Sequence, residues 1–387
     1  MPNASHSGSG GPRLVLHIGA MKTGTTFLQQ LLADHRGVLG DHGFGVPRNQ
    51  ALALRGVLNG APAADAPTRR DRAAHQLLRQ VREYDGRATI VSWEFLSFLD
   101  RARARRVLDA FPGVHADVVL TVRDTARTMP AQWQTTCRNG TTLPWPRFAR
   151  GIGAWLDHGR DTRPARLFRR TQGVPQMLDV WTDLVGPQHV HVVTVPRSTD
   201  DPLLLWRRFA EVSGIDPALP VDPGVRSNPS LGHPSCELLR RINVAFGGKV
   251  PPGCTQVVRA VVAPDLEARA GIEPAVRLDA HGRDVATAWN RMVRDAITAA
   301  GVAVHGDLDD LPAAPPEGVE DIHRPRPAEL LDAAATARAG LAGLGATPRA
   351  EPPADVDTAV EELAAMIREA AGIDLTAARR ERGRGRG

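Results

Sequence analysis

The sequence predicts an α/β protein of three layers, with a central parallel sheet, helices on both faces and a helical C-terminal extension. The first observation behind this prediction is an alternation of short apolar runs, rich in β-branched residues, with stretches of helical periodicity. This order is typical of parallel sheets that helices cover on both faces. The second observation is the length, because 387 residues are enough to bury a sizeable core.

The predicted strands are short and strongly apolar. The segment Arg13–Ile18 has the unbroken apolar pattern of a buried parallel strand. Similar runs follow at residues 88–92, 116–122 and 190–195. A first helix begins at Thr25, because apolar residues recur from there every three or four positions. Further helices are predicted at residues 203–212, 236–246, 284–300, 327–345 and 354–372.

Composition divides the chain into four segments. Residues 1–12 carry neither a basic patch nor an apolar run, so we expect a disordered leader and no signal peptide. Residues 13–312 hold the alternating pattern and form the predicted α/β domain. Residues 313–378 are rich in Ala and Pro and form the helical extension, and residues 379–387 form a basic, disordered tail.

The net charge of +5 does not indicate a nucleic-acid partner. Residues 379–387 hold five Arg and one Glu, a charge of +4, so +5 less +4 leaves about +1 for the rest of the chain. A nearly neutral body gains little from a polyanion. We therefore expect no nucleic acid among the partners.

Two further classes are excluded by pattern. No apolar stretch is long enough to span a bilayer, so we expect a cytoplasmic protein. Cys137, Cys236 and Cys254 are widely spaced, odd in number and without a C-x-x-C pair. This spacing argues against a disulfide framework and against a structural zinc site made of cysteines.

The most informative residue is Lys22, one of only two lysines beside 46 arginines. It lies in Met21-Lys-Thr-Gly-Thr-Thr-Phe27, between the first strand and the first helix. Such a loop directs backbone N–H groups and the positive end of the helix dipole toward one place, which binds an anion. Gly24, Thr25 and Thr26 would supply amides and hydroxyls. Lys22 would reach the anion as a compact point charge.

This loop differs from the ATP-binding Walker A pattern, G-x-x-x-x-G-K-[ST]. Here the lysine precedes the glycine by two positions, and Thr25 follows Gly24 directly. The order Lys-Thr-Gly-Thr-Thr-Phe instead resembles the 5′-phosphosulfate loop of the sulfotransferases. That resemblance implies a P-loop-like fold, 3′-phosphoadenosine 5′-phosphosulfate (PAPS) as co-substrate, and contacts from Lys22, Thr23, Gly24, Thr25, Thr26 and Phe27.

A second motif also resembles this family, at the end of the strand over residues 116–122. In the family an Arg there, and a Ser eight positions later, hold the 3′-phosphate of PAPS. Arg123 matches the Arg, but Ala131 stands at the position of the Ser. Thr128 or Arg127, one helical turn away, would then supply the missing donor. Without the resemblance, Arg123 is equally well interpreted as a strand-end residue that forms an ion pair with Asp124 or another carboxylate.

Transfer of a sulfuryl group needs a charge at the leaving oxygen and a base for the acceptor proton, and needs no metal. The resemblance places Lys22 at the leaving oxygen. Glu94 ends a predicted strand on the carboxyl edge of the sheet, where ligands of open α/β sheets bind, and is the leading base. His17 is the second choice, and a buried core histidine is the plainer interpretation of it. Phe27 matches an aromatic position near the adenine in relatives.

The sequence therefore predicts a sulfotransferase that uses PAPS, binds no metal and takes a small-molecule or glycan acceptor. One alternative is a P-loop kinase or NTPase, with Asp124 and Glu94 holding Mg²⁺, although the missing Gly-Lys-Ser/Thr counts against it. A second alternative is a non-catalytic nucleotide-binding protein, which Ala131 and the long Ala/Arg-rich C-terminal region favour. Neither the acceptor nor the oligomeric state follows from the sequence.

Overall fold

The computed structural model describes residues 13–60, 67–197, 201–222, 224, 230–314 and 323–372. The leader and the basic tail expected at residues 1–12 and 379–387 lie outside these ranges. Contacts divide the chain into two compact units. The first comprises Met1–Thr128, Arg166–Arg226 and Ala286–Pro315, and the second comprises Met129–Ala165, Ser227–Val285 and Pro316–Gly387. The continuous segments drawn from composition stay predictions.

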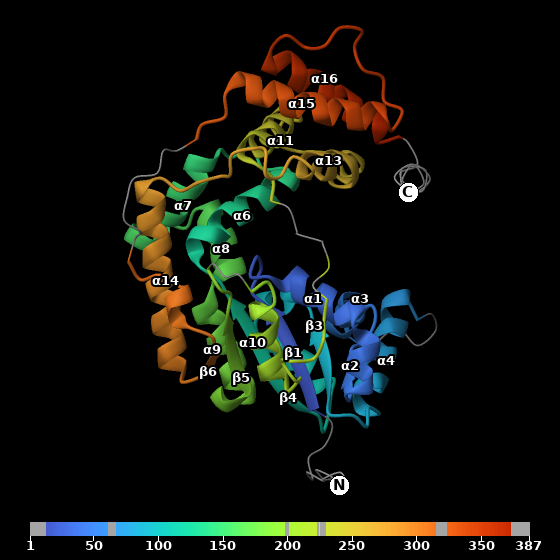
Figure 1. Cartoon of the computed structure of the whole chain (residues 1–387), viewed down its shortest axis with the longest axis vertical. Helices are drawn as coiled ribbons and strands as arrows, with labels where there is room; N and C mark the ends of the chain where they lie inside the picture. The colour runs from blue at the N-terminus through green and yellow to red at the C-terminus, as the bar shows by residue number, and fades with distance from the viewer. Residues whose placement is uncertain are drawn as a thin grey trace. The chain divides into compact units, whose positions relative to one another are not determined.

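The first unit is built on a six-stranded sheet in the order β2-β3-β1-β4-β5-β6, with every neighbouring pair parallel (Figure 1). The strands are β1 (Arg13–Gly19), β2 (Phe44–Gly45), β3 (Ala88–Ser92), β4 (His115–Val122), β5 (Val190–Thr194) and β6 (Ala303–His305). The predicted parallel sheet is thus confirmed. Sequence pattern missed β2, because a two-residue edge strand is too short to show a period.

Helices on both faces complete the layers of this unit. They are α1 (Thr25–Asp34), α2 (Arg36–Asp41), α3 (Gln50–Asn59), α4 (Arg69–Arg82), α5 (Arg101–Asp109), α9 (Val174–Val185) and α10 (Leu204–Ser213). Single 3₁₀ turns lie at η1 (Glu94–Phe98), η2 (Pro187–His189) and η4 (Leu308–Asp310). Three helices run from one unit into the other, namely α6 (Thr125–Arg138), α8 (Arg163–Gln172) and α14 (Ala280–Ala300).

Alternation along the strands assigns each face of the sheet to its own helices. Val15, Ile90, Val119 and Val193 belong to one buried cluster with residues of α1 and α10, including Leu28, Trp206 and Phe209. The intervening residues of β1, β4 and β5 are also buried, and α9 packs against β4 and β5. Burial on both faces explains why the strands read as continuous apolar runs.

The second unit is helical. It contains α7 (Trp145–His158), α11 (His233–Ala245), α12 (Pro252–Val257), a π-helical turn η3 (Val258–Val262), α13 (Ala263–Glu267), α15 (Pro327–Ala342) and α16 (Val356–Ala370). The last two are the helices predicted at residues 327–345 and 354–372, and both pack against α11. The three cysteines are free and buried.

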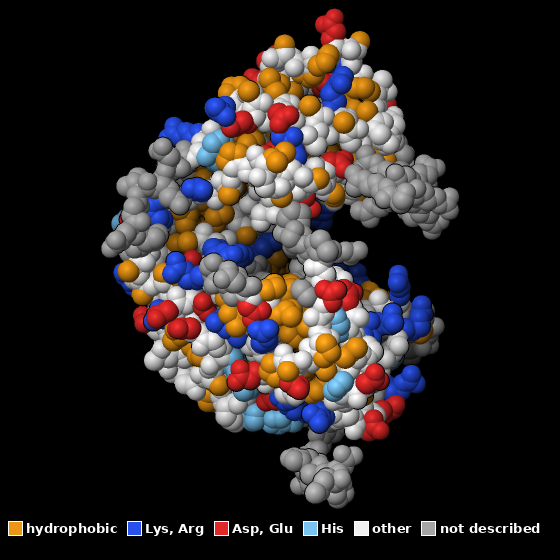
Figure 2. Space-filling model, viewed as in Figure 1, with side chains coloured by type: hydrophobic (Ala, Val, Ile, Leu, Met, Phe, Trp, Pro, Cys, Tyr) orange, Lys and Arg blue, Asp and Glu red, His pale blue; other side chains and the backbone are white. Residues whose placement is uncertain are grey.

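Acidic and basic side chains are interspersed over the visible face of the first unit (Figure 2), in keeping with the nearly neutral body expected from the sequence. Among the described helices, none combines the length and apolar composition that a membrane span requires.

Candidate active site

The loop between β1 and α1 has a backbone shaped for close approach to a ligand. Lys22 has φ 63° and Gly24 has φ 82°, both in the left-handed region. For a lysine this conformation costs about 1–3 kcal/mol, which surrounding structure must offset. Gly24 has no alternative, since a Cβ there would lie 2.5 Å from Cδ2 of Leu205. Backbone strain of this kind clusters at ligand-binding and active sites, so the conformation of Lys22 indicates a functional loop.

The first turn of α1 begins at this loop without a side-chain cap. Gly24 occupies the N-cap position, no side chain accepts a hydrogen bond from the first-turn amides, and no acidic residue lies in that turn. These amides and the positive end of the helix dipole therefore remain available for an anion. Thr26 is exposed at the same turn, and Thr25 is buried beside it.

Two other loop residues have structural contacts. The Thr23 hydroxyl is buried, donates to the carbonyl of Ala20 at 2.6 Å and lies 2.6 Å from Oγ1 of Thr121. Its side chain thus fixes the loop to β4. Phe27 packs, partly buried, against the hydrophobic core under the loop. The roles of both residues toward a nucleotide stay predictions.

Arg123 follows β4 and joins the second motif to the loop. Its Nη1 donates to the carbonyl of Lys22 at 3.1 Å, while its buried Nε has no hydrogen-bond partner. Burial, and then the nearby charge of Arg127, lowers the pKa of Arg123 to about 10. A largely desolvated guanidinium with an open donor is suited to bind an anion.

Asp124 is not that anion. Its Oδ1 accepts hydrogen bonds from Nδ2 of Asn290 at 2.9 Å and from the amide of Ala126 at 3.0 Å. Within the described part of the chain, no ion pair joins it to Arg123. The interpretation of Arg123 as an ion-pair partner of its neighbour therefore finds no support in the geometry.

The two predicted substitutes for the missing serine lie in different surroundings. The Thr128 hydroxyl is buried and donates within its own helix, to the carbonyl of Thr125 at 3.4 Å. Arg127 is exposed, and its Nη1 donates to the carbonyls of Pro196 and Arg197 after β5. Arg127 also lies close enough to affect the pKa of Arg123. Of the two, Arg127 is the better placed to add charge beside Arg123. Ala131 belongs to the second unit.

Glu94 opens η1 directly beyond β3. A Cβ on Gly19 would lie 3.2 Å from Cα of Glu94, so the glycine at the end of β1 lets the two segments meet. Oε2 of Glu94 accepts a hydrogen bond from Nε2 of Gln29 at 3.0 Å. Gln29 lies on α1, so one hydrogen bond connects the predicted base to the helix of the phosphate loop.

His17 is a core residue. It is fully buried, with Nδ1 2.8 Å from Oγ of Ser92 and Nε2 3.3 Å from Oγ1 of Thr121. Burial lowers its pKa to about 3, so the ring is neutral at physiological pH. Both ring nitrogens are engaged, and catalysis by His17 stays a prediction that none of these contacts supports.

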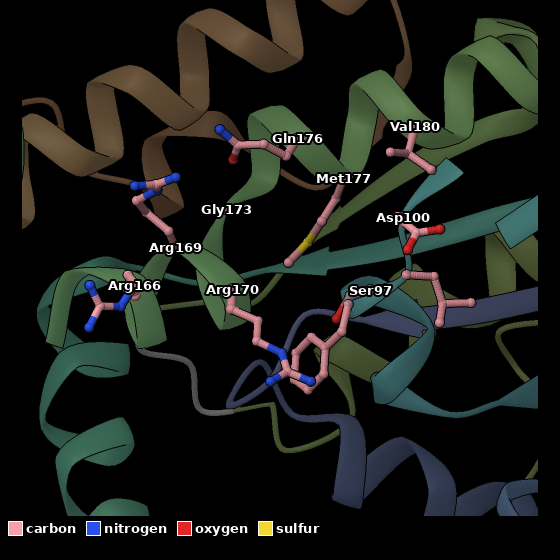
Figure 3. A pocket seen from close by; sticks show the side chains of 11 residues that line it. Ser97, Asp100, Arg166, Arg169, Arg170, Gly173, Gln176, Met177 and Val180 are labelled. Carbon is pink, nitrogen blue, oxygen red and sulfur yellow. The ribbon is translucent and has the colours of Figure 1, made fainter. Parts of the chain in front are cut away.

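A pocket of about 440 Å³ opens beside η1 (Figure 3). Ser97 and Phe98 of η1 line it, together with Arg166, Arg169 and Arg170 of α8 and with Met177 of α9. The Arg170 guanidinium lies 5.0 Å from the Phe98 ring centroid, a cation–π distance. Sequence reasoning found no pocket here, because the lining comes from elements some 70 positions apart.

Sequence reasoning also missed two glutamines that hold the site. Besides Gln29, Gln172 of α8 is buried, and its Nε2 donates to the carbonyl of Met21 at 2.5 Å. Trp289 in turn donates to the carbonyl of Gln172 at 3.2 Å. No local signal marks residues whose partners lie far away in the sequence.

No protein-family model and no curated protein matches this chain. The solved structures similar to it include the following two. A sulfotransferase from Alicyclobacillus acidocaldarius is 17% identical, with a TM-score of 0.39, over 60% of this chain and 90% of its own. The sulfotransferase domain from the curacin biosynthetic pathway is 10% identical, with a TM-score of 0.31, over 57% of this chain and 81% of its own. At these TM-scores the likeness establishes neither fold nor activity.

Replacing Arg123 tests whether its charge serves a ligand or the fold. We expect Arg123→Met to change the free energy of unfolding of the ligand-free protein by no more than about 1 kcal/mol, because only the bond to Lys22 is lost. Arg208→Met is the matched control, since Nη1 of Arg208 pairs with Oδ2 of Asp310 at 2.5 Å. Removing the charged partner of this largely buried carboxylate should cost more, up to about 3–5 kcal/mol, although Asp310 keeps its hydrogen bond from Thr194. Denaturant titration measures both, and equal losses would make Arg123 structural.

Proposed function

We propose that this protein is a sulfotransferase that moves the sulfuryl group of PAPS to a hydroxyl or amine of an acceptor. One observation carries the proposal. The guanidinium of Arg123 is bonded to the backbone of the lysine loop and keeps a buried donor without a partner. A nucleotide with a phosphate at each end of its ribose would satisfy both the loop and Arg123, whereas ADP would leave Arg123 open.

The residues present fit such a co-substrate. The uncapped first turn of α1 offers amides to a 5′-phosphate, and Arg123 with Arg127 offers charge to a 3′-phosphate. When bound, PAPS supplies the sulfuryl group. Lys22 stabilises the negative charge that develops on the leaving oxygen as the bond between sulfur and that oxygen breaks. Glu94 takes the proton that the acceptor oxygen or nitrogen releases as it bonds to sulfur.

Gln29 orients the base. Its amide donates to both Oγ of Ser92 and Oε2 of Glu94, at 3.2 and 3.0 Å. A carboxylate held by one hydrogen bond keeps its other oxygen for the acceptor. The preorganised position reduces the rearrangement that proton transfer requires.

The pocket beside η1 is our proposed acceptor site. It begins at Ser97 and Phe98, three and four residues after Glu94, so an acceptor bound there would reach the base along one helical turn. Its lining contains apolar residues, which suit the body of a small molecule or sugar, and polar groups that fix its orientation.

The kinase alternative is less well supported by this geometry. Asp124 would have to coordinate Mg²⁺, but it is buried, and its Oδ1 already accepts two hydrogen bonds. The loop also lacks the Gly-Lys-[Ser/Thr] order of P-loop enzymes, because Met21 precedes Lys22. The Thr23 hydroxyl that follows Lys22 is buried and engaged with Ala20 and Thr121.

Nucleotide selectivity tests the proposal directly. At about 100 times its Kd, 3′-phosphoadenosine 5′-phosphate should add about 2.7 kcal/mol to the free energy of unfolding, visible as a higher Tm. ADP at the same concentration should raise Tm much less, and Arg123→Met should remove the difference. Equal shifts with the two nucleotides, or a larger one with ATP and Mg²⁺, would favour a kinase or NTPase.

Lys22→Ala should lower the rate of sulfuryl transfer by about 100-fold or more, the usual effect of removing one preorganised charge. Lys22→Arg should not restore it, because the planar guanidinium does not fit a tight loop as an ammonium does. The assay measures how fast 3′-phosphoadenosine 5′-phosphate is released from PAPS. The acceptor is the one that gives the highest rate in a panel of phenols, sugars and amines. Lys249→Ala, at the exposed second lysine, is the control. Full activity in Lys22→Ala contradicts the role of Lys22.

Glu94→Gln should bind 3′-phosphoadenosine 5′-phosphate as the wild type does, because the shape of the side chain is retained. Its turnover should fall by about 10²–10⁴-fold, the usual contribution of a positioned base. Glu83→Gln, at an exposed carboxylate after α4, should leave turnover unchanged. Loss of nucleotide binding in Glu94→Gln, together with inactivity of His17→Asn alone, would assign the base to His17.

A further inference from the structure

Three side chains with metal-binding chemistry, His115 and Asp117 of β4 and His189 at the end of η2, meet at the amino edge of the sheet, away from the phosphate loop. A fourth, His191 of β5, lies close to this group, with its Nε2 4.0 Å from Oδ1 of Asp117. Histidine side chains are visible at the lower end of the first unit, where the strands begin (Figures 1 and 2). The proposed sulfuryl transfer uses none of these residues.

Strand geometry explains why the four residues converge. His115 and Asp117 are two positions apart on β4, so their side chains project to the same face. The parallel register pairs Val118 with Val190 and Val119 with His191. Asp117, one residue before Val118, therefore lies close to His189, the last residue of η2, and to His191 of β5.

One oxygen of Asp117 is the centre of the group. Its Oδ1 lies 3.1 Å from Nδ1 of His189, 3.4 Å from Nε2 of His115 and 4.0 Å from Nε2 of His191. Around a tetrahedral zinc ion with bonds of about 2.0–2.1 Å, neighbouring ligand atoms are about 3.3 Å apart. The distances to His189 and His115 match this spacing, and His191 has to move closer to serve as the fourth ligand.

The other oxygen of Asp117 is held in place. Its Oδ2 accepts a hydrogen bond from Nε of Arg13 at 2.7 Å, and the same guanidinium donates to the carbonyls of Val212 and Ser213. The anchored Arg13 fixes the carboxylate and leaves Oδ1 directed at the imidazoles. An outer residue that orients a ligand in this way is a regular part of metal sites.

We propose that His115, Asp117, His189 and His191 bind one zinc ion. Three imidazole nitrogens and one carboxylate oxygen form a set that suits zinc and is too poor in oxygen for Mg²⁺ or Ca²⁺. Since four protein ligands leave no open position, the ion is structural: it fastens the start of β4 to η2 and β5. The proposal is independent of the proposed transferase activity.

The test is zinc binding by the full chain after treatment with a chelator, in competition with a chromophoric chelator. We expect one zinc per chain, and at least about tenfold weaker binding in His115→Gln, since loss of even an outer-shell residue weakens a site by this factor. His115 has a half-exposed side chain, so its replacement should leave the fold intact, which circular dichroism verifies. His42→Gln, at an exposed histidine outside the group, is the control.

Two further readouts make the outcome decisive. Zinc should raise the Tm of the wild type and of His42→Gln but not of His115→Gln, and cobalt in its place should give the visible absorption of a four-coordinate ion. Removal of zinc should leave nucleotide binding unchanged, so failure here is distinguishable from failure of the transferase proposal. Equal affinity in wild type and His115→Gln, or no binding against the competitor, overturns the site.

Discussion

A buried chain of hydrogen bonds at the carboxyl ends of three strands holds the candidate active site together. Thr121 of β4 lies within hydrogen-bonding distance of the Thr23 hydroxyl, donates to the carbonyl of Gly19 and approaches Nε2 of His17. His17 then reaches Ser92 of β3 through its other nitrogen. These groups are out of contact with water, so each must find its partner inside the protein. The loop conformation follows from this requirement.

The same chain gives His17 its role. A charged imidazole in this position would be desolvated without a carboxylate to compensate it, and burial accordingly lowers its pKa to about 3. The neutral ring accepts at one nitrogen and donates at the other, which connects β3 with β4 through β1. Ser92 continues the connection to Gln29 and from there to Glu94. The position of the proposed base thus depends on a histidine that does not itself exchange protons near neutral pH.

Arg13, Arg123 and Arg208 differ in their partners. Arg208 pairs with Asp310, and Arg13 pairs with Asp117, each with additional carbonyls around the guanidinium. The guanidinium of Arg123 donates to a carbonyl, and no described ion pair joins it to a carboxylate; the charge of Arg127 lowers its pKa, and the charge of Asp124 raises it. The ion-paired Arg13 and Arg208 connect strands of the sheet with the helix α10. An unpaired and partly buried arginine costs free energy in the ligand-free protein, and an anion would offset this cost.

The two edges of the sheet have opposite chemistry for a topological reason. At the carboxyl edge, the first turn of α1 presents unbonded amides, and Lys22 and Arg123 add positive charge. At the amino edge, the residues at the start of β4 and just before β5 place the imidazoles of His115 and His189 close to the Asp117 carboxylate. In a parallel sheet all strands start at one edge and end at the other, so residues near strand starts gather far from residues near strand ends.

The sequence by itself determined the parts of this protein that depend on neighbouring residues. Continuous apolar runs defined β1, β3, β4 and β5, because strands buried on both faces need apolar side chains at every position. The loop around Lys22 was equally readable, since its glycine, its lysine and the helix start are adjacent along the chain. Tertiary structure alone decided the contacts between distant segments: the hydrogen bond of Gln29 to Glu94, that of Gln172 to the loop, and the open donor of Arg123. These depend on strand order and register, which a single sequence does not encode locally.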